Sequence, residues 1–489
     1  MNKRLSGLLS LVLSACLMGG GCIKMGPDFK KPDLQFAQPE RFQYRTKHAK
    51  AVVPEDRWWE VFGDPEINGL VKRVLKNNPD LQQAAARILE LQYQVIQTRA
   101  DRFPALGFQG GAQRQHEPES TLGPGIPIGG TVNQYSFSLP ASFEIDLWGK
   151  YARAEEASRA QLLQEKENRL TLSQSLLAEA IGLYLQIQSL ERRIQITLQS
   201  LKNYQDSVTF VQRRYKRGLT SILDLRQARR TLNQAKGQIP QLRQELGAAQ
   251  QALSVLSGEY PKTRKPYPQP EDYYKKLSAI PPGLPSELLL RRPDIRAAEA
   301  QLKALNAQIG VAKASRFPSI GLTGSYGYAS EELSNLFQPG AAWSLVAGLA
   351  QPLFDAGRLK ANQRAAEARY VQGVAAYSKA VLNAFREVEN ALLTRRKQIE
   401  RRTDVLSFLV EARATQRVAE TRYVRGLVDY LIVLNAQQTR FQAEDQLLLV
   451  ELTILANRVT LHRALGGGWA ELPPVKGKET EGLGSYTIW

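Results

Sequence analysis

The chain has 489 residues and a formal net charge of +18, from 65 Lys and Arg against 47 Asp and Glu. Only 43% of the residues are hydrophobic and the mean hydropathy is −0.34. This balance argues against the three compact globular domains that length alone would suggest, and it suits long helices with one buried stripe. The basic residues are spread along helical segments without interleaved aromatics, so the composition does not predict a nucleic-acid partner.

The N-terminus has the pattern of an export signal. Lys3 and Arg4 precede a short apolar run that is too short to cross a bilayer. Small residues and the chain's two cysteines follow, as in bacterial lipoproteins whose processed cysteine is acylated. We expect residues 1–21 to be a signal peptide and Cys22 to be the lipid anchor. Cys16 is the alternative, because the residues before it fit the processing box better. Neither cysteine is followed by Asp, which favours the outer membrane.

The rest of the sequence is an internal repeat. Pro79-Asp80-Leu81 recurs at an offset of 214 as Pro293-Asp294-Ile295. Gly149 and Gly258 recur at an offset of 208 as Gly357 and Gly466. The offset changes once, so the halves differ by six residues between Pro104 and Gly149. We therefore divide the chain into six segments: signal peptide 1–21, lipid-anchored linker 22–57, first repeat 58–260, Pro-rich connector 261–285, second repeat 286–469 and disordered tail 470–489.

Each repeat contains a strand-like pattern early in its length. Apolar side chains alternate with polar ones from Tyr135 to Asp146 and from Ile320 to Tyr328, which is the period of a strand. A Pro- and Gly-rich stretch, 116–130, predicts the loop of the first hairpin, and 331–340 predicts the second. Strands of about ten residues with one apolar face fit a transmembrane barrel.

Very long helices follow the hairpins. Gly149 to Gly218 and Gly357 to Gly426 are equally long and contain no Pro, and apolar residues recur at the helix period. At 1.5 Å per residue such a helix reaches about 100 Å. A second helix then returns toward Gly258 or Gly466, with a kink expected at Pro240 in the first repeat.

Four strands per chain cannot close a membrane sheet. Lipid offers no water to unpaired backbone groups, and membrane barrels need at least about eight strands. Copies of the chain must therefore complete the barrel, as a dimer or a trimer, and the helices should extend it as a tube.

The sequence resembles the TolC-like outer-membrane efflux proteins, in the lipoprotein branch that serves RND-type pumps, over nearly its whole length. The motifs that carry the resemblance occur in the family's order: Gly26-Pro27-Asp28-Phe29, Trp58-Trp59, 143–150 (FEIDLWGK), 281–286 (PPGLPS), 291–299 (RRPDIRAAE), 354–359 (FDAGRL) and 464–469 (ALGGGW). The resemblance implies an α+β membrane protein. Its trimer would form a 12-stranded β-barrel, with four strands per chain, continued by a periplasmic α-helical barrel.

The resemblance also implies a function, partners and site residues. The trimer would be a passive exit duct in the outer membrane of a Gram-negative bacterium, docked to a periplasmic adaptor and an inner-membrane RND pump. Two helix turns would form the periplasmic tip and docking site: Arg214, Tyr215, Gly218, Leu219, Arg422, Tyr423, Gly426 and Leu427. Leu431, Asn435 and nearby Asp429 would line the pore constriction. Relatives often carry Asp at the position of Asn435, and its absence weakens one reason for cation preference.

Other function classes fit less well. His48, His116 and His462 show no metal-ligand spacing, and the Gly-rich stretch 123–130 lacks a phosphate-loop context, so we expect no enzyme and no cofactor. A type I secretion duct, or a periplasmic structural lipoprotein without a pore, remains an alternative. The exported substrates are not encoded in any motif that we recognise.

Overall fold

The computed structural model describes residues 24–34, 36–37, 39–44, 57–121, 127–266, 290–338 and 340–467. The predicted signal peptide, both candidate anchor cysteines and the predicted tail beyond residue 467 lie outside these ranges, as do His48 and most of the Pro-rich connector. The described chain forms two compact units by its internal contacts. The first comprises residues 1–33, 88–165 and 297–377; the second comprises 34–87, 166–296 and 378–489.

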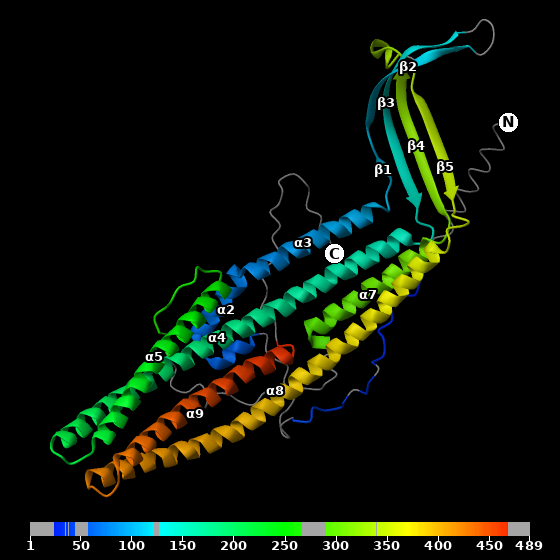
Figure 1. The fold of residues 1–489 in the computed structure, drawn as a ribbon. Helices are drawn as coiled ribbons and strands as arrows, with labels where there is room; N and C mark the ends of the chain where they lie inside the picture. The colour runs from blue at the N-terminus through cyan, green and yellow to red at the C-terminus, as the bar shows by residue number, and fades with distance from the viewer. Residues whose placement is uncertain are drawn as a thin grey trace. The chain divides into compact units, whose positions relative to one another are not determined.

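The two repeats form matching elements (Figure 1). The first repeat contains η1 (Trp58–Phe62), α2 (Pro65–Asn77), α3 (Pro79–Ala100), β1 (Ala105–Leu106), β2 (Gln109–Thr121), β3 (Pro127–Ile145), α4 (Lys150–Lys216) and α5 (Ile222–Leu256). The second contains α7 (Pro293–Ala314), β4 (Ser319–Ser330), η2 (Leu333–Asn335), β5 (Ala342–Ala350), α8 (Arg358–Val424) and α9 (Tyr430–Ala464).

The helix lengths confirm the repeat. α4 and α8 each have 67 residues, α5 and α9 each have 35, and α3 and α7 each have 22. The glycines that the repeat aligned, Gly149 with Gly357 and Gly218 with Gly426, all have positive φ at helix boundaries. α5 continues unbroken through Pro240.

No helix in the described part of the chain combines the length and the apolar character needed to cross a bilayer.

The first unit is built on an antiparallel sheet. β3 pairs with β1 and β2 on one side and with β4 on the other, and β4 pairs with β5. β1 and β2 meet the same partner and are separated only by Gly107 and Phe108, so they occupy one edge of the sheet. The sheet is therefore four strands wide, as predicted.

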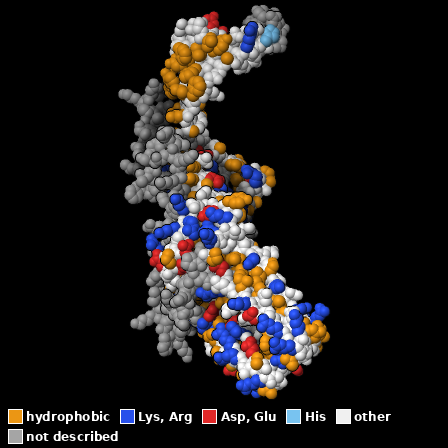
Figure 2. Space-filling view, turned by 90° about the vertical axis from the view of Figure 1, so that its left-hand side faces the viewer, with side chains coloured by type: hydrophobic (Ala, Val, Ile, Leu, Met, Phe, Trp, Pro, Cys, Tyr) orange, Lys and Arg blue, Asp and Glu red, His pale blue; other side chains and the backbone are white. Residues whose placement is uncertain are grey.

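Large apolar side chains are exposed on this sheet. They include Leu106 (82%), Trp343 (76%), Leu345 (73%) and Leu349 (71%). Figure 2 shows hydrophobic side chains gathered over the strands, where an ordinary water-soluble sheet would be polar.

The first hairpin loop is shorter than the sequence predicted. We expected loop over 116–130, but β2 continues to Thr121 and β3 starts at Pro127, with a register shift between Glu117 and Ser120. Gly and Pro are tolerated near strand ends and bulges, and pairing with a long partner strand overrides their local preference for turns. The second loop, between Ser330 and Ala342, is where it was predicted.

The second unit has a hydrophobic core around the middle of α4. Ile181 and Tyr184 on α4 are fully buried against Trp58, Ile67 on α2 and Leu253 on α5. The Tyr184 hydroxyl donates to Asp64 Oδ2 at 2.5 Å, and Asp64 also caps the N-terminus of α2. The Trp58-Trp59 and Asp64-Pro65 motifs therefore serve packing and capping.

Candidate functional site

The two helix–helix turns of the second unit share one backbone design. After α4, the N–H of Leu219 donates to the Arg214 carbonyl (3.0 Å) and the N–H of Gly218 to that of Tyr215 (2.9 Å). After α8, Leu427 donates to Arg422 and Gly426 to Tyr423, both at 2.9 Å. This is the Schellman pattern, in which a left-handed glycine ends a helix and satisfies its last carbonyls. All eight residues predicted for the tip therefore belong to these two motifs.

The glycines are required by conformation rather than by space. Gly218 has φ +71° and Gly426 has φ +75°, in the left-handed region, and a Cβ at either position would meet nothing within 4 Å among the described residues. Any L-residue there would be strained by its backbone alone. The recurring Arg-Tyr-x-Arg-Gly-Leu sequence is thus explained by two tight turns of identical geometry.

The helices that leave the turns are capped differently. Ser221 and Asp224 form a reciprocal capping box at the start of α5, in which each side chain accepts from the other's backbone N–H. Asp429 occupies the N-cap position of α9 but makes no capping hydrogen bond through its side chain. Asp429 is exposed, and so are Leu431 (42%) and Asn435, which lies one turn after Leu431 on the same face of α9.

An arginine–aromatic cluster joins the two turns within this unit. The Arg214 guanidinium lies 5.1 Å from the ring centre of Tyr423 and 5.9 Å from that of Phe210. Tyr423 in turn lies 5.4 Å from Tyr430. Val211, Leu225, Val433 and Leu434 bury the aromatic rings from α4, α5 and α9. Burial raises the pKa of Tyr430 to about 12, so its hydroxyl stays protonated.

The predicted residues therefore divide into two groups. Arg214 and Tyr423 pack against each other, and Tyr423 is only 7% exposed. In contrast, Leu219 is 60% and Leu427 67% exposed, and Tyr215 (41%) also faces outward. Arg422 is exposed as well and Arg214 is half-exposed, so both can reach a partner, whereas the ring of Tyr423 is buried.

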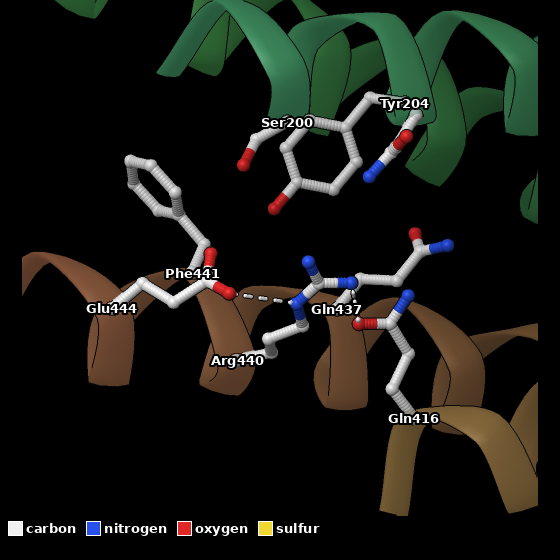
Figure 3. Close-up of a pocket in the computed structure, with 8 residues that line it drawn as sticks. Ser200, Tyr204, Gln416, Gln437, Arg440, Phe441 and Glu444 are labelled. Carbon is white, nitrogen blue, oxygen red and sulfur yellow. Dashed lines mark hydrogen bonds and ion pairs between the residues drawn. The ribbon is translucent and has the colours of Figure 1, made fainter. Parts of the chain in front are cut away.

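The sequence analysis missed a small polar pocket between α4, α8 and α9 (Figure 3). Its volume is about 10 Å³, and it is lined by Ser200, Asn203, Tyr204, Gln416, Gln437, Arg440, Phe441 and Glu444. Gln437 donates to Glu420 (3.1 Å) and Ser207 (3.3 Å), while Arg440 donates to Glu444 (3.1 Å). This volume suits about one water molecule. A comparison of the two repeats could have pointed to this pocket, because two of its lining residues, Gln437 and Arg440, differ from their first-repeat counterparts, Arg229 and Leu232.

The first unit contains a second feature that the sequence did not reveal, a clamp on the segment after Cys22. The N–H of Met25 donates to the Trp148 carbonyl (3.0 Å), and Arg153 Nε donates back to the Met25 carbonyl (3.1 Å). Arg153 also binds Asp28 at 2.8 Å, and its hydrogen bond lowers the pKa of that carboxyl. Gly26 lies so close to Gly310 that an added Cβ would be 2.6 Å from its Cα. The Gly-Pro-Asp-Phe motif thus fixes this segment to the helices.

Within the described ranges, no group of three or more His, Cys, Asp or Glu side chains is placed to hold a metal ion. His116 contacts Thr131 on the neighbouring strand (3.0 Å), and His462 stacks on Trp58 at 5.1 Å.

The sequence matches the family described as outer membrane efflux protein over residues 70–259 and 284–467. It is 32% identical to the cation efflux system protein CusC of Escherichia coli over 96% of this chain and 99% of that protein. It is 32% identical to the probable outer membrane lipoprotein SilC of Salmonella typhimurium, covering 94% and 99%. The toluene efflux pump outer membrane protein TtgI of Pseudomonas putida is 33% identical, covering 94% and 98%.

Solved structures match as well. The outer-membrane channel OprN superposes with a TM-score of 0.85 at 30% identity, covering 91% of this chain and 99% of that one. A CusC structure gives 0.81 at 31% identity, covering 91% and 99%. The predicted fold class, an α+β chain whose trimer forms the channel, is confirmed by these neighbours.

Proposed function

The chain belongs to the outer membrane efflux protein family, and from this premise we propose how its residues form, open and dock an efflux duct. It is the outer-membrane channel component of a tripartite efflux system, as its relatives are. The described sheet carries the argument. The sheet is four strands wide and exposes large apolar side chains. Within the described chain, neither β5 nor the β1/β2 edge pairs with a further strand.

Those two open edges call for further copies. A sheet edge cannot face lipid, because its N–H and C=O groups would lose hydrogen bonds worth several kcal/mol each. Joining β5 of one copy to the β1/β2 edge of the next closes the sheet, and three copies give twelve strands. Recording purified full-length protein in a planar bilayer tests this. Discrete conductance steps are expected, and their absence from correctly folded oligomers would reject the duct.

We assign the docking of a periplasmic adaptor to the exposed residues of the two turns, Tyr215, Leu219 and Leu427, with the glycine motifs holding them in place. This assignment is supported by the exposure of these three side chains on the turns, because exposed apolar side chains mark contact surfaces. A photo-crosslinking residue at 219 or 427 should capture the adaptor in cells, while one at exposed Gln251 on α5 should not. Equal crosslinking of the adaptor from positions 219, 427 and 251 would refute the assignment. An RND-type pump would deliver cargo through that adaptor.

The constriction is assigned to Leu431 and Asn435, with exposed Asp429 at the start of the same helix supplying a carboxylate. The support is their position on the exposed face at the start of α9, next to the turn. Asn435→Asp would place a ring of three carboxylates in the trimer and should raise cation preference in single-channel recordings. Unchanged conductance and unchanged selectivity would disprove the assignment.

The lipid anchor is assigned to Cys22. The clamp on Met25 and Asp28 supports it, because an anchor three residues away leaves little slack between lipid and protein. Mass spectrometry of the purified protein should find acyl chains on Cys22, and Cys22→Ser should abolish them. Acylation that persists in Cys22→Ser and disappears in Cys16→Ser would establish the alternative. The six-segment division of the chain remains part of this proposal.

A further inference from the structure

The two helix pairs of the second unit pack against each other, and we call this packing the internal contact. It joins α4 and α5 of the first repeat to α8 and α9 of the second. Gln437 of α9 donates to Ser207 of α4 at 3.3 Å. Asp445 of α9 binds Arg193 of α4 at 2.6 Å. Tyr430, which is 2% exposed, lies in the apolar cluster that spans all four helices. The internal contact is therefore both packed and hydrogen-bonded.

The repeat gives each residue of the internal contact a counterpart 208 positions away. α4 and α8 have equal lengths, and so do α5 and α9, so a residue and its counterpart occupy the same place on their helices. Many of the counterparts are exposed, whereas the residues of the internal contact to which they correspond are buried or half-buried. These exposed counterparts are Ile222, Arg229, Arg230 and Lys236 on α5 and Arg401, Phe408, Glu411 and Thr415 on α8. Within the described chain, α5 and α8 thus each present one uncovered face.

The two faces carry apolar side chains at positions that are packed in the internal contact. Ile222 on α5 is 48% exposed, whereas its counterpart Tyr430 is 2% exposed. On α8, Phe408 is 43% exposed, whereas its counterpart Ser200 is half-buried. Exposed apolar residues of this kind mark a contact surface. Because the α5 face and the α8 face correspond to the two sides of one contact, each fits the other face on a second copy of the chain.

The open edges of the sheet call for the same order of copies. β5 belongs to the second repeat and the β1/β2 edge to the first. Closing the sheet therefore places the second repeat of one copy beside the first repeat of the next. A contact between α8 of one copy and α5 of the next has this order as well. Head-to-tail contacts of this type can close into a ring of identical copies.

Charge distinguishes the contact between copies from the internal one. The pocket of Figure 3 lies in the internal contact, and its lining includes the neutral residues Asn203 and Gln437 together with Glu444. Their counterparts, in the same order, are Glu411, Arg229 and Lys236. In the part of the chain that the structure describes, these three counterparts are exposed and form no ion pair. One carboxylate and two cations therefore come together only where two copies meet.

We propose that copies of this chain meet along α5 and α8 in the geometry of the internal contact, and that Glu411 of one copy is held by Arg229 and Lys236 of the next. This inference rests on the proposed function, because the contact exists only in an assembly of copies. Complementary charges of this kind select the correct partner surface and reject a wrong one. Glu411 and Arg229 are thus specificity residues for self-assembly, and the neutral internal contact needs no such pair because one chain supplies both of its sides.

Crosslinking of paired cysteines in isolated outer membranes tests the geometry. Arg229→Cys combined with Thr415→Cys places thiols at the counterparts of Gln437 and Ser207, which touch in the internal contact. A short bis-maleimide should link copies of this variant into species of two and three times the chain mass. The matched control, Ser207→Cys combined with Gln437→Cys, should link within one chain and leave its mass unchanged. Each single variant accounts for the natural cysteines of the chain.

Charge reversal tests the ion pair. Arg229→Glu should lower the temperature at which the detergent-extracted trimer dissociates, because it places a second carboxylate beside Glu411 of the neighbouring copy. Adding Glu411→Arg should recover about half of that loss or more, with Lys236 limiting the recovery. Arg213→Glu is the matched control. Arg213 and its counterpart Thr421 are both exposed, so this position lies in neither contact and the change should leave the dissociation temperature unaltered.

A trimeric, conducting preparation in which Arg229→Cys with Thr415→Cys gives only single-chain products would overturn the inference while the duct stands. The ion pair is refuted if Arg229→Glu and Arg213→Glu lower the dissociation temperature equally, or if Glu411→Arg recovers nothing. A wild-type preparation that contains only single chains would overturn the proposed assembly and the inference together.

Discussion

Replacing Tyr423 with leucine should loosen the packing that joins the two turns. The side chain contributes a cation–π contact with Arg214 at 5.1 Å and an aromatic pair with Tyr430 at 5.4 Å. A partly desolvated cation–π contact is worth about 0.5 to 2 kcal/mol, and an aromatic pair about 0.5 to 1.5 kcal/mol. Their loss together amounts to about 1 to 3.5 kcal/mol. If these contacts exist only in the closed tip, the ratio of open to closed channels should rise by roughly fivefold to three hundredfold.

Single-channel open probability in a planar bilayer measures this change. Tyr423→Phe is the control that isolates the ring from the hydroxyl. The hydroxyl is buried and has no hydrogen-bond partner among the described residues, so phenylalanine should preserve the wild-type behaviour. If Tyr423→Leu and Tyr423→Phe open equally often, the cluster does not hold the tip closed. Arg214→Gln should resemble Tyr423→Leu, and the double variant should add little, because both changes remove the same contact.

Three further predictions concern stability. Gly426→Ala should lower the free energy of unfolding by about 1 kcal/mol, since φ +75° strains any side chain, and thermal melts against Gly182→Ala, inside α4, would detect it. Burial lowers the pKa of His462 to about 3, so between about pH 3 and pH 6.5 the unfolded chain binds a proton at this side chain that the folded chain does not. The free energy of unfolding should therefore decrease as the pH drops below 6.5, by up to about 1.4 kcal/mol per pH unit. His462→Gln should flatten that part of the pH profile, and an unchanged slope would contradict the burial argument. Tyr184→Phe should cost about 1 to 3 kcal/mol in chemical unfolding, because it leaves buried Asp64 and Gln188 without their shared hydroxyl, and a neutral result would refute that network.

The sequence predicted the features that the repeat and the helix period encode. Equal spacing between Gly149 and Gly218, and between Gly357 and Gly426, predicted two helices that both have 67 residues. Positive φ at Gly218 and Gly426 follows from the need to end a helix tightly. Local chemistry and one internal comparison were sufficient for these features.

The features that the sequence did not predict depend on partners distant in the chain. Arg153 binds Met25 and Asp28 across more than 120 residues, and no spacing rule connects them. The strand boundaries around 116–130 were misplaced, because backbone pairing with β3 outweighs the turn preference of Pro and Gly. The ion pairs of Asp445 with Arg193 and of Glu451 with Arg402 likewise join residues on different helices that no spacing rule connects.

The central claim is that copies of this chain complete one another's sheet. Mass photometry of the channel extracted from outer membranes in detergent tests it most directly, on the same preparation that conducts in a bilayer. The account predicts a single species at three times the mass of the processed chain. A conducting preparation that contains only single chains would contradict it.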